Sequence, residues 1–115
     1  MTVKHDITVP QGANFEMTIE AKNADRSVMN LTGWSARMQV RETVESVTPL
    51  LDASTSNGRI TINAPGGIVM VNVDASVTGA MVWTNGVYDL EIFTSATNVK
   101  RLAEGFAYLS PEVTR

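Results

Sequence analysis

Three carboxylates in the second half of this 115-residue chain have the types and spacing that could do chemistry. Asp89 and Glu91 lie two positions apart in an alternating segment, so on a strand both side chains would point to one face. Glu104 belongs to the next predicted strand and could join them. Such a cluster could supply a general acid and base, or oxygen ligands for Ca²⁺.

A structural role explains the same carboxylates better. Arg37 and Arg41 share the polar face of an earlier alternating segment and could pair with Asp89 and Glu91 across neighbouring strands. Each such pair contributes about 0.2 to 1 kcal/mol. The sequence offers no third group to orient a catalytic pair. We therefore predict no catalytic residue, no bound metal and no cofactor, and we expect cross-strand ion pairs with arginines such as Arg37.

The remaining polar residues add little chemistry. His5 is the one histidine and lies beside Asp6 near the N-terminus, where a single imidazole cannot be both base and metal ligand in the usual hydrolytic sites. We expect it to be an exposed residue at the end of a strand. Gly66 and Gly67 follow a proline without the helix that a phosphate-binding loop requires, so they are predicted to form a turn. The prediction is a protein that is not an enzyme.

Aromatic residues raise a different possibility, a platform on which sugars could stack. The candidates are Trp34, Trp83, Tyr88 and Tyr108. Most are expected to be core instead, because they occupy the apolar phase of alternating strands, where large rings fill a sandwich interior. The residues predicted to be buried on this basis are Trp34, Met38, Tyr88 and Leu90.

These side chains must be positioned by short strands, because apolar and polar residues alternate at 15–22, 34–41 and 87–94. Segments 59–63 and 68–73 flank a Pro-Gly turn and are predicted to form a hairpin. A last strand is expected at 99–109, and a less clear one at 47–53. Turn-forming residues separate them, including those at 54–58, 64–67 and 84–86. Residues 74–81 break the alternation, and we expect a short helical crossover between two sheets there, with Asp74 as the N-cap.

The pattern predicts an all-β fold, an antiparallel, immunoglobulin-like β-sandwich of about seven or eight strands with Greek-key connections. Residues 1–115 are expected to form a single domain, since no linker or repeat divides them. The apolar stretch Ile68–Val71, with Met29 and Met81 elsewhere, has two explanations. It could be buried at the centre of a sheet, or it could be a surface that is covered only on assembly.

Composition narrows the classes of partner. The net charge is -3, and the Lys and Arg residues are scattered singly except at Lys100 and Arg101, so we expect no nucleic-acid binding. No signal peptide is recognisable at the N-terminus, and no apolar run approaches the length needed to cross a bilayer, so no membrane insertion is expected. The chain has no cysteine, so the fold must be stable through packing alone.

Three stretches together resemble small β-sandwich virion proteins of tailed bacteriophages. They are Val9–Phe15 leading through Leu31–Arg41, then Asn85–Glu91, then Leu102–Gly105 to Thr114. They contain a Q-G pair before a strand, the sequence L-T-G-W-S-A-R-M-Q-V-R, and the sequence G-V-Y-D-L-E. The chain is most similar in this respect to the N-terminal domain of siphophage upper baseplate proteins.

The resemblance implies a structural protein of the virion, assembled in the bacterial host cytoplasm. Its implied role is a tail, baseplate or fibre-attachment adaptor that is present in multiple copies and contacts other phage structural proteins. A capsid decoration (cement) protein is the alternative within that class, and a carbohydrate-binding module is the alternative outside it. We expect the terminal segments, residues 2–9 and 110–115, to be contact surfaces that a neighbouring protein orders.

Overall fold

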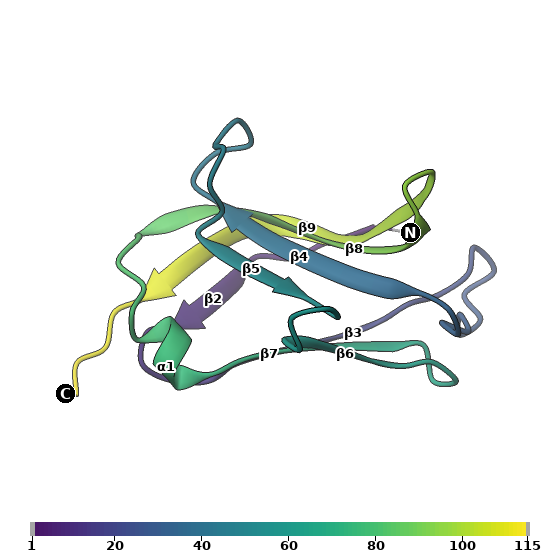
Figure 1. The fold of residues 1–115 in the computed structure, drawn as a ribbon, viewed down its shortest axis with the longest axis horizontal. Coiled ribbons are helices and arrows are strands. Elements are labelled where there is room, and N and C mark those ends of the chain that lie inside the picture. The colour runs from purple at the N-terminus through teal and green to yellow at the C-terminus, as the bar shows by residue number, and fades with distance from the viewer. Residues whose placement is uncertain (1, 115) are drawn as a thin grey trace.

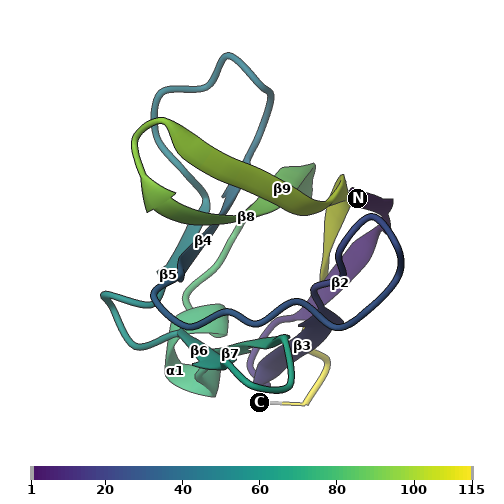
Figure 2. The same ribbon diagram turned by 90° about the vertical axis from the view of Figure 1, so that its right-hand side faces the viewer.

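The strands form two layers that pack face to face, as Figures 1 and 2 show. The structure is a computed structural model and describes residues 2–114. The larger sheet has the strand order β1-β9-β8-β4-β5, with β2 also paired to β9, and the smaller sheet has the order β3-β7-β6. The elements are β1 (Val3–Lys4), β2 (Ile7–Pro10), β3 (Phe15–Glu20), β4 (Ser35–Arg41), β5 (Leu51–Ser54), β6 (Ile60–Asn63), β7 (Ile68–Val73), α1 (Ala75–Thr78), β8 (Asn85–Ser95) and β9 (Asn98–Ser110).

The connections confirm an immunoglobulin-like sandwich. The chain crosses between the sheets at β2–β3, β3–β4, β5–β6 and β7–β8, whereas β4–β5, β6–β7 and β8–β9 are antiparallel neighbours in one sheet. This alternation produces the Greek-key order. The 84–86 turn is one local difference, because Asn85 and Gly86 are the first residues of β8.

The short helix α1 is the predicted crossover, and it is held by hydrogen bonds to the turn after β2. The Asp74 side chain makes no capping bond. Instead, Asn14 Oδ1 accepts a hydrogen bond from the Ala75 backbone N–H at 2.9 Å. Thr78 is fully buried, and its hydroxyl donates to the Ala13 carbonyl at 2.7 Å. The helix is therefore fixed by tertiary contacts, which four residues need because an isolated helix of this length is unstable.

The core lies between the sheets and follows the alternating pattern. Met38, Tyr88 and Leu90 are buried as predicted. Trp34 is an exception, since it is only half-buried. It lies just before β4, where its backbone N–H donates to the Leu31 carbonyl at 3.0 Å. The ring therefore packs against the core from the margin of the sandwich.

The apolar stretch in β7 is not buried on both sides. Val69, Val71 and Val73 are the inward residues, whereas Met70 is 38% exposed on the outer face of the smaller sheet. The pairs across β3 and β7 run from Phe15 opposite Val73 to Glu20 opposite Ile68. The strand thus has one solvent-exposed face, like its neighbours. The expectation of burial at the centre of a sheet is therefore wrong for Met70.

The N-terminal segment departs most from expectation. It forms β1 and β2, which pair with β9 in parallel rather than antiparallel orientation, so the larger sheet is mixed. Ile7 and Val9 are 6% and 0% exposed. Residues 2–9 therefore belong to the core sheet of the molecule and need no neighbour to order them. The pairing of this segment with β9 could not be predicted from the sequence, because the segment is short and His5 and Asp6 interrupt its alternation of apolar residues.

Among the residues that the structure describes, no helix has the length and hydrophobicity to span a bilayer.

Candidate contact surface

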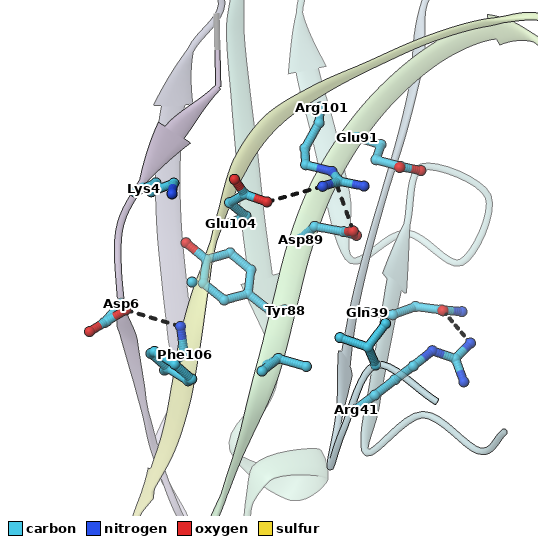
Figure 3. Close-up of a pocket in the computed structure, with 13 residues that line it drawn as sticks. Lys4, Asp6, Gln39, Arg41, Tyr88, Asp89, Glu91, Arg101, Glu104 and Phe106 are labelled. Carbon is cyan, nitrogen blue, oxygen red and sulfur yellow. Dashed lines mark hydrogen bonds and ion pairs between the residues drawn. The ribbon is translucent and has the colours of Figure 1, made fainter. Parts of the chain in front are cut away.

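A groove with a volume of about 660 Å³ crosses the outer face of the larger sheet. Figure 3 shows its side chains, which come from β1, β4, β8, β9 and the segments beside them. The three carboxylates singled out by the sequence, Asp89, Glu91 and Glu104, all line it. The period-two spacing therefore placed them correctly on one face.

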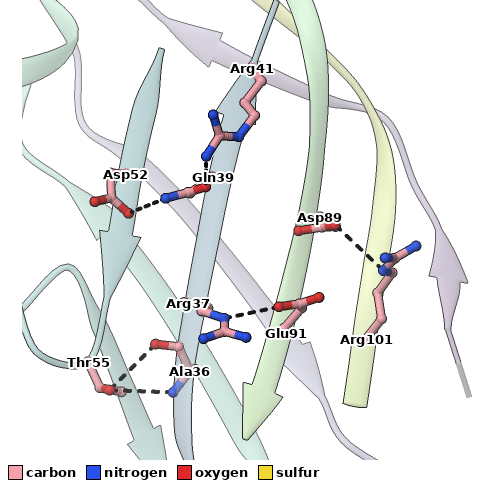
Figure 4. Close-up of polar contacts among 9 residues, drawn as sticks. All are labelled: Ala36, Arg37, Gln39, Arg41, Asp52, Thr55, Asp89, Glu91 and Arg101. Carbon is pink, nitrogen blue, oxygen red and sulfur yellow. Dashed lines mark hydrogen bonds and ion pairs between the residues drawn. The ribbon is translucent and has the colours of Figure 1, made fainter. Parts of the chain in front are cut away.

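Arg101 separates two of these carboxylates. Asp89 and Glu104 are directly opposite one another in the β8–β9 ladder, an arrangement in which like charges repel. Arg101 bonds to both, with its Nε 3.5 Å from Asp89 Oδ2 and its Nη1 3.0 Å from Glu104 Oε1. Figure 4 shows the Asp89 pair. An irregularity in the ladder after Leu90 brings Arg101 opposite Glu91, so the guanidinium lies among acidic groups.

The third carboxylate pairs with the arginine that the sequence predicted. Arg37 lies opposite Glu91 in the β4–β8 ladder, and its Nε donates to Glu91 Oε1 at 3.0 Å. The Arg37 guanidinium carbon also lies 4.5 Å from the centroid of the Phe93 ring, a cation–π contact. The bond to Glu91 confirms the prediction of a cross-strand ion pair at Arg37.

Arg41 has a different role from the one expected. Its Nη1 donates to the carbonyls of Ser46 and Val47, each at 2.7 Å, and its Nη2 donates to Gln39 Oε1 at 2.7 Å. Val87, not a carboxylate, is its partner in the β8 ladder. Arg41 therefore anchors the loop after β4, and the expected pairing with Asp89 is wrong.

The electrostatics of the groove disfavour an ionised Asp89. Partial burial raises the pKa of the Asp89 carboxyl above its usual value, and the neighbouring charge of Glu91 raises it further. Arg101 opposes both effects. A carboxylate that pairs with an arginine on the neighbouring strand is typical of a structural network of charges. The groove lining contains no Ser, Thr, Cys or His.

Apolar side chains form the other end of the groove. Val87 and Phe106 are cross-strand partners on the outer face, and Phe106 is 56% exposed. Val44, from the loop held by Arg41, is 79% exposed beside them. Tyr108 follows Phe106 by two positions in β9, so it shares the same face, and it is 45% exposed. We call Val44, Val87, Phe106 and Tyr108 the apolar patch.

This patch was not predicted from the sequence, although a signal for it is present. Phe106 and Tyr108 continue the outward phase of Glu104 along β9. Of the aromatic residues considered for sugar stacking, Tyr88 is buried, and Trp34 and Trp83 are half-buried.

The N-terminal rim of the groove is held by a buried hydroxyl. Tyr88 donates a hydrogen bond to the His5 carbonyl, and the Asp6 carboxylate accepts one from the Phe106 backbone N–H at 3.0 Å. Burial, with the charge of Asp6 as a second cause, raises the pKa of Tyr88 to about 12. His5 itself is exposed, as predicted, and its side chain is not part of the groove lining.

Gly105 lets β9 lie close to His5 and Asp6, the two residues between β1 and β2. A Cβ atom built on this glycine would lie 2.5 Å from the His5 carbonyl oxygen. Any larger residue would push the N-terminal strands away from β9.

The Q-G pair explains how the two ends of the chain meet. Gln11 Nε2 donates to the Met81 carbonyl at 2.8 Å, and its Oε1 accepts from the Glu112 N–H at 2.9 Å. Gly12 has φ +81°, a left-handed conformation that glycine adopts without strain. The C-terminal residues 111–114 are otherwise outside any helix or strand and are mostly exposed, whereas Ser110 is the last residue of β9. Residue 115 lies outside the described residues.

A second, smaller cavity of about 410 Å³ lies beside the crossover, lined by residues such as Leu50, Val77 and Trp83. Across residues 2–114, no three His, Cys, Asp or Glu side chains are grouped so that they could hold a metal ion.

No protein-family model matches the sequence, and no curated protein is significantly similar to it.

Proposed function

We propose that this chain is a non-enzymatic structural protein of a tailed-bacteriophage particle, an adaptor in the tail, baseplate or fibre attachment. The apolar patch is the observation that carries the protein-binding part of this proposal. Exposed Phe106 and Tyr108 share one face with Val44, beside charges that are already paired within the chain. Aromatic residues surrounded by a polar rim are typical of protein interfaces.

The assignment to a phage particle is supported by the resemblance of the three sequence stretches. In the structure, two of these stretches hold parts of the sandwich together. The Q-G pair fastens the turn after β2 to Met81 and Glu112. The G-V-Y-D-L-E stretch supplies Tyr88, Asp89 and Glu91, which hold the N-terminal strands and the charged network.

The direct test is negative-stain imaging of phage particles labelled against this protein. Label at the tail tip or fibre junction is the expected result. Label distributed over the head would replace the adaptor with a capsid decoration protein, and particles without label would refute the proposal altogether.

A matched pair of variants tests the apolar patch. Phe106→Asp should leave the fold intact, because the ring is 56% exposed, and should reduce incorporation into particles in a trans-complementation assay. Val28→Asp is the control, since Val28 is 46% exposed in the β3–β4 connection. Full rescue by Phe106→Asp would show that the contacts lie elsewhere.

A carbohydrate-binding module is the second candidate, because Phe106 and Tyr108 are neighbouring exposed rings on one face. Glycan binding that is lost in Phe106→Ala and in Tyr108→Ala would favour this candidate over the adaptor.

A further inference from the structure

The outer edge of β3 is the feature that the proposed function leaves unexplained. β3 (Phe15–Glu20) pairs along its full length with β7 on one side. On its other side no strand of residues 2–114 is paired with it. An edge of this kind presents unpaired backbone donors and acceptors, which natural proteins usually protect.

The other three sheet edges are protected in recognisable ways. The edge formed by β1 and β2 is interrupted between Lys4 and Ile7 and ends in Pro10. β6 has four residues and is followed by Ala64 and Pro65. β3 is the longest continuous edge strand of the described chain, with six residues and no proline.

β5 is protected by side chains from the connection that follows it. The strand has four residues, and the Asp52 carbonyl already accepts hydrogen bonds from Asn57 Nδ2 at 3.0 Å and from Arg59 Nη1 at 2.8 Å.

Inward side chains of β3 are also incompletely covered. Met17 and Ile19 point toward the core but are only half-buried. Their partners in β7, Val71 and Val69, are 2% and 0% exposed. A strand added to the edge of β3 would place its own inward side chains beside Met17 and Ile19 and complete this margin of the core.

The outward side chains of β3 select the kind of strand. Glu16 and Glu20 flank Thr18 on this face, and all three are exposed. A second copy paired antiparallel about Thr18 would place each Glu16 opposite a Glu20, which is unfavourable. Glu20 Oε1 lies 3.2 Å from Lys22 Nζ, but an exposed ion pair of this kind is weak, so a strand with basic residues at these positions would still find opposite charges.

We propose that the edge of β3 is the docking site for an extended segment of a different protein, one in which apolar residues alternate with Lys or Arg. This inference names the partner chemistry for the adaptor role and rests on the proposed function only in assigning that segment to a particle component.

The test uses the purified full chain and a capped peptide of about eight residues in which Val and Lys alternate. A second peptide with Glu in place of Lys is the comparison. Amide hydrogen exchange, followed by NMR, locates the binding. We expect protection of β3 amides by the Lys peptide and about tenfold weaker binding of the Glu peptide. The double variant Glu16→Lys, Glu20→Lys should reverse this preference.

A matched control carries the same charge change in a loop, Glu42→Lys with Glu45→Lys, where both residues are exposed. It should keep the preference for the Lys peptide. Binding that ignores peptide charge, or protection that appears on another strand, would overturn the inference. Protection of β3 that rises with protein concentration without peptide would also overturn it, because the occupant would then be a second copy. If β3 binds peptides with the expected charge selectivity but the imaged phage particles carry no label for this protein, only the assignment to a phage particle is refuted.

Discussion

The Tyr88 hydroxyl donates a hydrogen bond to the backbone carbonyl of His5, and this contact joins the N-terminal strands to the core of the sandwich. The two residues are 83 positions apart in the sequence. Tyr88 reaches this carbonyl from the inward face of β8, beside Gly105, its partner in β9. The interruption between β1 and β2 is thus a fixed structural feature, in which His5 and Asp6 both bond to β9 or β8.

Tyr88→Phe should lower the free energy of unfolding by about 1 kcal/mol at neutral pH, because it removes one hydrogen bond. The difference between the two proteins should then shrink as the pH rises from about 10 to about 12. The unfolded chain releases its tyrosine proton near its ordinary pKa of 10, whereas the folded-state pKa is about 12. Urea denaturation across this pH range is the measurement, and a difference that does not change with pH would contradict the buried hydroxyl.

Removal of residues 2–10 should abolish or severely weaken folding, because it deletes β1 and β2 together with buried Ile7 and Val9. Removal of residues 111–115 should cost little, since this tail contributes the bond from Glu112 N–H to Gln11. Thermal denaturation of the two truncated chains compares the ends directly. Equal stability of both would show that the parallel pairing with β9 is unimportant.

Leu90→Ala should destabilise the fold by about 2 to 5 kcal/mol, because Leu90 is fully buried between the sheets. Trp34→Ala should cost less than the 3 to 5 kcal/mol of a fully buried aromatic, since its ring is only half-buried. Chemical denaturation of both variants tests this order. A larger loss at Trp34 would restore the original expectation of a buried ring.

Thr78→Val should cost about 1 to 3 kcal/mol, although the two side chains have similar shapes. The substitution removes the donor to the Ala13 carbonyl in a fully buried position. Thr78→Ser is the control, because it keeps the hydroxyl and loses a methyl group. If Val proved less disruptive than Ser, packing rather than the hydrogen bond would hold α1.

Asp89→Asn should not lower the melting temperature at neutral pH. The pKa of Asp89 is raised in the folded state, so the fold favours the protonated carboxyl. The stabilisation from this group is therefore complete below pH 3.8, the usual pKa of the carboxyl, and is lost as the pH rises through the folded-state pKa. Any stability advantage of Asp89→Asn should therefore vanish in acid.

Glu91→Gln breaks the pair with Arg37 and should cost up to about 1 kcal/mol. Calorimetry with Ca²⁺ completes the experiment, and stoichiometric binding lost in Asp89→Asn would contradict a structural network.

Alternation, the turn residues and the break in the pattern at residues 74–81 were together sufficient to predict the sandwich, the strands β3 to β9, the crossover at α1 and the common face of Asp89 and Glu91. Alternation determines which side of a strand is buried, and this property is local. The ion pair between Arg37 and Glu91 followed from the same phase, because both residues belong to long and regular strands.

The tertiary structure alone decided which segments lie side by side. β1 and β2 are too short to show a period, and their parallel pairing with β9 depends on Asp6, Tyr88 and Gly105, which meet only after folding. Arg101 reaches Asp89 and Glu104 because the β8–β9 register shifts after Leu90, and no local pattern encodes that shift. The free edge of β3 likewise follows from the N-terminal strands joining the other sheet, since pairing between distant segments is a property of the whole chain.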